Sequence, residues 1–332
     1  MSQGASTVTV DLTAVIVAVT AADPRVLVVR RSDVAADWFP SGPLREEHRT
    51  LQAGLRSWVE HQTRLRLGHV EQLYTFGDRD RTLVEDRRPD ARALSLAYLA
   101  LTREAGLVGG NGEGRNGEET GAMEATWRSW YDYLPWEDRR DRDAAERSVL
   151  ATRLGAWARG ESDRYARKDR LNRVILAFGL DGQPWDEERC LERYELLYEA
   201  RLIPEAWADA HMPVPEAVRE LGGRPMAADH RRILATAAGR LRAKIKYRPV
   251  LFELMPESFT LLHLQRTAEA LAGAGLHKQN FRRLVEQNRL VEETGEVFSE
   301  TGGRPAKLMR FRPEIRQERP SSGVRLKARP GA

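Results

Sequence analysis

The sequence has a single cysteine and no hydrophobic run long enough to cross a membrane. Cys190 is the only cysteine among 332 residues, which excludes an internal disulfide and any zinc site with several thiolates. A lone thiol suits a reducing compartment, so we expect a cytoplasmic protein. The apolar run from Thr13 to Thr20 is short, lacks a preceding basic segment and contains β-branched residues. It therefore predicts a strand instead of a signal peptide or a membrane span.

The net charge is also small, at +4, because a basic end balances an acidic body. Residues 226–332 hold 21 Lys and Arg against 11 Asp and Glu, a charge of +10. The totals of 53 and 49 leave 32 against 38 for residues 1–225, a charge of −6. The length allows two or three domains, and a basic end suits a DNA-binding domain fused to another module. Residues 314–332 are rich in Pro, Gly, Ser and Arg, and we expect a disordered basic tail there.

Residues 226–313 read as a linker helix followed by helix, turn, helix and a basic β-hairpin, the order of a winged helix-turn-helix. Thr260 is a good N-cap, and Phe259 with Leu264 suits a hydrophobic staple. Gly273 and Gly275 end the first of the two helices and allow a tight turn. The expected wing strands are Leu290–Val291 and Leu308–Phe311, with a basic tip between them.

The second helix has one apolar and one polar face, as a helix that enters the major groove requires. Phe281, Leu284, Val285 and Asn288 share the first face, and Gln and Arg side chains on the other suit base edges. A solvated helical hairpin with scattered arginines is the alternative, but caps, turn and wing together favour DNA binding. The predicted DNA contacts are Thr260, Lys278, Gln279, Asn280, Arg282, Arg283, Arg304 and Lys307.

Residues 5–135 are expected to form a sheet with an amphipathic helix. Strands are predicted at Val8–Thr20, Arg25–Arg31, Val70–Phe76 and Ala91–Leu101, with Asp23–Pro24 as the first turn. Leu51, Leu55, Trp58 and Val59 mark the buried face of the helix. The fold class is α+β: an α/β sandwich, a helical insertion and a C-terminal winged helix-turn-helix.

The segment from Trp38 through this helix resembles a Nudix hydrolase. The resemblance implies a glutamate-rich loop and helix that hold Mg²⁺ against a diphosphate. Here Gly42, Arg56 and Glu60 match the family's box, whereas the box positions for other Glu and the closing Gly hold His48, Ser57, His61 and Thr63. Mg²⁺ prefers oxygen ligands, so we predict a degenerate box without metal, catalytic residues or cofactor.

Both halves together resemble the Nudix-related transcriptional regulators of NAD metabolism. Stretches that carry the resemblance include Glu71–Asp78, Ser95–Leu101, Asp229–Ala237, Arg240–Val250, Asn280–Arg283 and Arg304–Lys307. It implies repression of NAD biosynthesis or salvage genes, with ADP-ribose or a related nucleotide weakening DNA binding. A single recognition helix per chain further predicts a homodimer on a palindromic operator.

Residues 136–225 fit the shorter members of that family badly and are expected to be a helical insertion. It could cover the effector pocket or widen a dimer contact, and the sequence leaves both open. Residues 109–121 read as a flexible loop. The aromatic residues between Trp127 and Trp136 could stack on a nucleobase, but core packing is favoured.

Other polar residues allow two interpretations each. Arg30, Arg31, Arg56 and Arg79 are candidates for an effector diphosphate, or are ordinary solvated arginines. His48 and His61 beside Glu60 could bind a transition metal, although surface substitutions are favoured. His230 opens the linker helix as a cap or packing residue in preference to a catalytic base. The alternative function is a nucleoside-diphosphate hydrolase with an accessory C-terminal module.

Overall fold

The computed structural model describes residues 8–31, 36–77, 92–104, 123–140, 144–247, 250–299 and 305–312. Several predictions fall outside these residues: Arg79 and Arg304, the loop 109–121 and the tail 314–332. The side chain of Arg31 lies outside them as well. The chain divides into two compact units. Unit 1 comprises residues 1–18, 25–133 and 225–237, and unit 2 comprises residues 19–24, 134–224 and 238–332.

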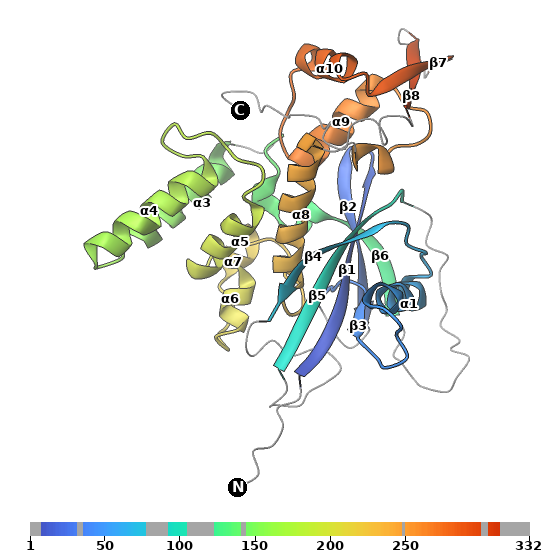
Figure 1. The fold of residues 1–332 in the computed structure, drawn as a ribbon. Helices are drawn as coiled ribbons and strands as arrows, with labels where there is room; N and C mark the ends of the chain where they lie inside the picture. Colours follow the sequence, from blue (N-terminus) through green and yellow to red (C-terminus); the bar gives the residue numbers. More distant parts are fainter. Residues whose placement is uncertain are drawn as a thin grey trace. The chain divides into compact units, whose positions relative to one another are not determined.

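Unit 1 is built on a mixed six-stranded sheet (Figure 1). Its order is β4-β5-β1-β2-β6, and β3 pairs with β1. Strand β1 runs parallel to β5, whereas β2–β6 and β4–β5 are antiparallel. The elements are β1 (Val8–Thr20), β2 (Asp23–Arg31), β3 (Ser41–Pro43), α1 (Leu51–Thr63), β4 (Val70–Phe76), β5 (Arg92–Leu101), β6 (Met123–Ser129) and α2 (Trp130–Tyr133).

Alternation along β1 explains how α1 packs on this sheet. Every second residue from Leu12 to Ala18 joins a buried cluster that also holds Leu55 and Val59 of α1. Thr50 caps α1 by accepting a hydrogen bond from the Ala53 N–H at 3.1 Å. The amphipathic pattern of the sequence therefore predicted the core face of this helix correctly.

The first turn of the sheet differs from the sequence prediction. Asp23 and Pro24 begin β2, and the turn lies at Ala21 and Ala22, whose φ values are 51° and 61°. Two central residues with positive φ are typical of a type I′ turn, whose twist matches that of the flanking strands. The continuous pairing of two long strands thus overrides the ordinary preference for Asp and Pro in turns.

Unit 2 is mainly helical and ends in a two-stranded sheet. Its elements are η1 (Pro135–Glu137), α3 (Ala144–Arg159), α4 (Arg164–Phe178), α5 (Cys190–Glu199), α6 (Pro204–Ala208), α7 (Glu216–Leu221), η2 (Val250–Glu253), α9 (Leu261–Ala272), α10 (Lys278–Gln287), β7 (Val291–Phe298) and β8 (Ala306–Phe311). Helix α8 (His230–Tyr247) begins in unit 1 and continues into unit 2. Helices α3 to α7 give the described part of residues 136–225 the helical character that the sequence predicts. No helix among the described residues is long and apolar enough to cross a membrane.

The aromatic segment 127–136 is a piece of core. Trp127, Trp130, Tyr133 and Trp136 are each at least 92% buried. Burial of this kind removes the faces that a nucleobase would need for stacking. The packing interpretation of these residues is therefore the correct one.

Candidate nucleic-acid interface and the Nudix-like loop

Helix α9 begins and ends as its sequence predicts. The Thr260 hydroxyl accepts a hydrogen bond from the His263 N–H at 3.1 Å, and Gly273 caps the C-terminus with φ +67°. Leu264, Ala268 and Leu271 form the buried face. Gly275 has no positive φ, and an added Cβ there would meet nothing within 4 Å. Of these two glycines, therefore, only Gly273 adopts a backbone conformation that favours glycine.

The turn between α9 and α10 is held by two polar side chains that sequence reasoning missed. The Glu269 carboxylate accepts hydrogen bonds from the Leu276 N–H at 2.9 Å and from the Gln265 amide at 3.0 Å. The same Gln265 amide donates to the Leu276 carbonyl at 3.3 Å. Their spacing of four residues places Gln265 and Glu269 on one face of α9, which is the only signal that the sequence offered. These bonds fix the chain that leads into α10.

Helix α10 presents a continuous polar face. Phe281 and Val285 are buried, and the side chains opposite them are exposed, namely Lys278, Gln279, Asn280, Arg282 and Arg283. Within the described part of the chain, the three cations of this helix form no ion pair, so their charges remain available to an anion. An exposed helix face with Arg, Gln and Asn suits both phosphates and base edges.

The wing packs back onto the start of α9. Strands β7 and β8 are antiparallel, and Phe259 and Met309 exchange two backbone hydrogen bonds of 2.9 and 2.8 Å. A bulge between Glu293 and Val297 contains Gly295 at φ +87°. The predicted wing is therefore present, and β7 is longer than the two residues expected.

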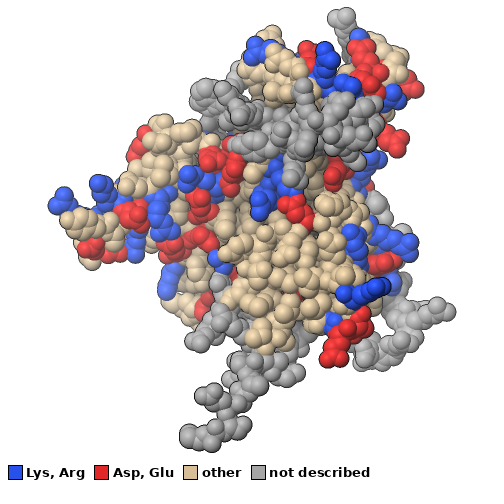
Figure 2. Space-filling view, in the orientation of Figure 1, with Lys and Arg blue, Asp and Glu red and all other residues tan. Residues whose placement is uncertain are grey.

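Both cations of β8 are paired with glutamates of β7. Lys307 forms an ion pair with Glu293 at 2.7 Å, and Arg310 forms one with Glu292 at 2.6 Å. Figure 2 shows Lys and Arg mixed with Asp and Glu over the winged helix domain. Because Lys307 is already paired with Glu293, whereas the cations of α10 form no ion pair among the described residues, a phosphate contact by Lys307 would have to share or replace this pair.

In unit 1, the loop before α1 is tied to that helix by uncharged and aromatic groups. Trp58 donates to the Pro43 carbonyl at 2.9 Å, and Gln62 bonds both backbone groups of Ser41. A Cβ at Gly42 would lie 2.3 Å from the Trp58 ring, so Gly42 is needed for this packing. Close packing of Gly42 against Trp58, together with these hydrogen bonds, thus holds the loop against α1.

The box positions where glutamates are replaced make ordinary structural contacts. His48 accepts from the Arg45 N–H at 3.1 Å and packs edge-on against Trp58, and Ser57 and His61 are exposed. Glu60 pairs with Arg66 at 2.8 Å, and the Thr63 hydroxyl donates to the Val59 carbonyl. Among the described residues, no group of three His, Cys, Asp or Glu is arranged to hold a metal ion.

The arginines suggested for an effector are engaged within unit 1. Arg30 donates twice to the buried Asp37, at 2.7 and 3.0 Å, and Tyr133 donates to the other oxygen of that carboxylate at 2.7 Å. This contact raises the pKa of Arg30. Arg56 donates to the Leu67 and Gly68 carbonyls at the end of the α1 loop. A phosphate that bound Arg30 or Arg56 would have to replace these bonds or add to them.

His230 is a packing residue. Its ring stacks on Phe39 with centroids 5.7 Å apart, and its Nδ1 accepts from the Phe39 N–H at 2.8 Å. Burial lowers the pKa of His230 to about 4, so the ring is neutral near pH 7. No substrate-facing proton transfer is needed to explain this residue.

Comparison with known proteins supports both halves of the architecture. Residues 251–311 match the family model of the NrtR DNA-binding winged helix domain. An ADPR-responsive transcriptional repressor, NtrR, from Acinetobacter baylyi is 41% identical over 86 residues, which is 26% of this chain. The match spans 34% of the length of that curated relative.

Two solved structures share the fold. The NrtR of Shewanella oneidensis matches with a TM-score of 0.51 and 19% identity, covering 93% of this chain and 97% of that one. A MutT/nudix family protein from Enterococcus faecalis matches with a TM-score of 0.52 and 14% identity, covering 94% and 89%. The predicted α+β class is confirmed. The chain thus joins a Nudix-like fold to a winged helix domain that matches the NrtR DNA-binding family over residues 251–311.

Proposed function

We propose that this protein is a transcriptional repressor whose Nudix-like domain senses ADP-ribose or a related NAD-derived nucleotide. One observation carries the proposal. An exposed helix face, whose three cations form no ion pair with any residue that the structure describes, lies in a domain that matches the NrtR DNA-binding winged helix. The relative with 41% identity is named for ADP-ribose response and repression, which supports the same pair of activities here.

DNA recognition in this proposal depends on α10. Gln279, Asn280, Arg282 and Arg283 read base edges, while Lys278 and the N-terminal part of α9 at Thr260 contact phosphates. One helix of ten residues covers only part of an operator. The protein therefore acts as a homodimer on a palindromic site, and the controlled genes serve NAD biosynthesis or salvage.

The Nudix-like domain binds without catalysis in this proposal. His48, Ser57 and His61 supply no carboxylate to Mg²⁺, and the one retained Glu60 is paired with Arg66. An effector that binds the DNA-free arrangement more favourably by about 1.4 kcal/mol would raise the dissociation constant for the operator tenfold. No bound cofactor and no metal enter this scheme.

The test measures binding and hydrolysis on the same preparation. Isothermal titration with ADP-ribose should give saturable binding, and the same ligand should raise the dissociation constant for an operator duplex. Incubation with ADP-ribose and Mg²⁺ should release no AMP. Retention of Glu60 within a Nudix-like fold is what keeps the hydrolase alternative open, and steady release of AMP with each addition of substrate would establish it.

A further inference from the structure

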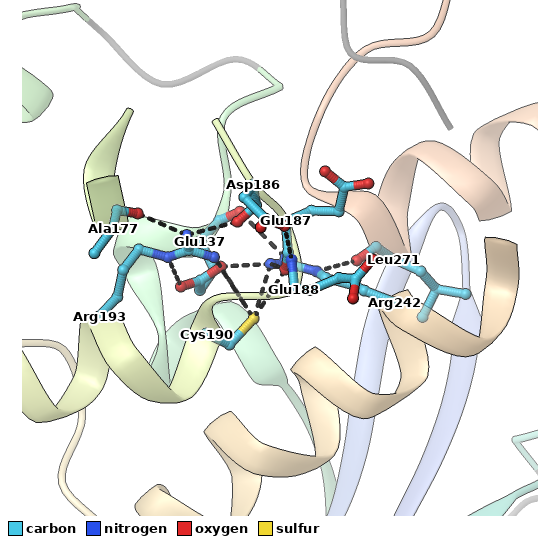
Figure 3. A network of polar contacts seen from close by, with 9 residues as sticks. All are labelled: Glu137, Ala177, Asp186, Glu187, Glu188, Cys190, Arg193, Arg242 and Leu271. Carbon is cyan, nitrogen blue, oxygen red and sulfur yellow. Dashed lines mark hydrogen bonds and ion pairs between the residues drawn. The ribbon is translucent and has the colours of Figure 1, made fainter. Parts of the chain in front are cut away.

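In unit 2, a buried carboxylate lies between two buried guanidiniums (Figure 3). Glu137 is 1% exposed, and Arg193 and Arg242 are fully buried. Arg193 donates to both Glu137 oxygens, at 2.6 and 2.9 Å, and Arg242 donates to Glu137 Oε2. Glu137 comes from η1, Arg193 from α5 and Arg242 from α8, so the cluster joins three elements far apart in sequence.

Two cations and one anion leave an excess positive charge, which backbone carbonyls offset. Arg193 donates to the Ala177 carbonyl in the last turn of α4 at 2.9 Å. Arg242 donates to the Leu271 carbonyl in the last turn of α9 at 2.7 Å. The C-terminal end of a helix carries partial negative charge, so both placements are favourable. Burial raises the pKa of Cys190 to about 12, and its neutral thiol donates to Glu137.

A second set of contacts reaches the same end of α9. The Arg139 N–H donates to the carbonyl of the cap residue Gly273 at 2.7 Å. The Arg139 and Arg193 guanidiniums lie over the Trp185 ring, 4.4 and 3.8 Å from its centroid. Leu271 and Gly273 immediately precede the turn that leads into α10. The Gly273 carbonyl is therefore bonded directly to the helical segment 134–224, and the Leu271 carbonyl is bonded to Arg242 of α8, which in turn pairs with Glu137 of that segment.

We propose that Arg242 and Glu137 are positioning residues for DNA recognition, holding the end of α9 and hence the recognition helix α10 on the helical segment 134–224. The helical segment 134–224 then supports DNA recognition by holding α9, and through it α10, in place. This inference rests on the proposed function, because it assigns to α10 the contact with DNA. It concerns residues that touch neither DNA nor effector.

The test replaces Arg242 with Lys. Lysine keeps the positive charge, but its single ammonium cannot bond the Glu137 carboxylate and the Leu271 carbonyl as the planar guanidinium does. Arg173→Lys is the matched control. Arg173 forms a bidentate ion pair with Glu199 on the surface of the same unit, where both side chains are 41% exposed. Hydrogen exchange of the full chain and binding to a selected palindromic duplex and to random duplex DNA are measured for both variants.

We expect R242K to speed amide exchange in residues 271–290 while leaving β1 of unit 1 unchanged. Affinity for the selected duplex should fall about fivefold or more, equivalent to loss of one base contact, with a much smaller change on random DNA. R173K should change neither. A folded R242K with unchanged exchange at 271–290, or with equal losses on both DNAs, would overturn the positioning role.

A wild-type measurement keeps the inference testable if R242K does not fold. Amides at the end of α9 and in α5 should then exchange with the same opening free energy across a urea series, as parts of one cooperative unit. Independent opening of α9 and α5 would refute the proposal. If the wild-type protein bound no duplex at all, the proposed function would fail, while the exchange experiment would still decide whether α9 is fastened to the insertion.

Discussion

Neutralising Glu137 should cost far more stability than neutralising any surface carboxylate of the chain. In Glu137→Gln the side chain keeps its shape, but two fully buried guanidiniums lose the carboxylate charge that they share. Removing one partner of a buried charged cluster typically costs about 3–5 kcal/mol, because the remaining charge stays desolvated. Glu199→Gln is the control, since its pair with Arg173 is solvated and worth at most about 1 kcal/mol.

The lowered pKa of Glu137 independently gives a similar contribution of this carboxylate to the free energy of unfolding. Burial alone would raise the pKa of Glu137, but Arg193 and Arg242 outweigh it and lower the pKa from 4.5 to about 2. A folded-state pKa below the unfolded value stabilises the fold above pH 4.5, and that stabilisation is lost as the pH falls from 4.5 toward 2. A shift of this size corresponds to roughly 3 kcal/mol.

Urea unfolding at several pH values measures both effects. At pH 7, the free energy of unfolding of E137Q should be about 3–5 kcal/mol below that of wild type, and it should fall less steeply than that of wild type between pH 4.5 and 2. E199Q should follow the wild-type curve closely. If E137Q and E199Q lost the same small amount, or if E137Q kept the wild-type acid dependence, the reasoning about the buried cluster would be refuted.

Four further predictions concern other sites. The free energy of unfolding should fall by up to about 3 kcal/mol as the pH drops from 6.5 to 4, because burial lowers the pKa of His230 to about 4 and the ring gains its proton more readily in the unfolded chain. In urea unfolding, His230→Gln should lose this contribution to the pH dependence. An unchanged pH dependence in the variant would show that other groups cause it. Gly42→Ala should destabilise unit 1 by about 1–3 kcal/mol through a clash with Trp58, whereas Gly68→Ala, where a Cβ meets nothing within 4 Å, should not; equal melting temperatures would contradict this. Arg283→Ala should weaken operator binding by about 1–3 kcal/mol and relax the choice of one base. Lys307→Ala should leave the salt dependence of binding near that of wild type, because Glu293 already neutralises Lys307; a slope lowered by about one unit would restore Lys307 as a phosphate contact.

Local signals in the sequence predicted the elements that local chemistry determines. Thr260 caps α9 and Gly273 ends it, as their preferences for N-caps and left-handed caps indicate. The strand at Val8–Thr20 and the buried positions Leu55 and Val59 of α1 were predicted from their residue patterns, and both join the same buried cluster. The turn at Ala21 and Ala22 was missed, because strand pairing determined it and neither residue is a usual turn former.

Long-range polar contacts could not be predicted in the same way. Glu137 is 56 residues from Arg193 and 105 residues from Arg242, and nothing in their spacing links them. Lys307 was expected at a basic wing tip, but its partner Glu293 became visible only with the register of β7 and β8. The assignment of individual DNA and effector contacts, and the boundaries drawn from sequence, stay predictions.

The proposed function requires that the protein bind a symmetric duplex and release it when ADP-ribose binds. This is measured by selecting duplexes that bind the full-length protein from a random pool, and by footprinting the enriched DNA with and without ADP-ribose. We expect one enriched palindrome, protected on both half-sites, and loss of protection as ADP-ribose is added. No enrichment from the pool, or a footprint that ADP-ribose leaves unchanged, would contradict it.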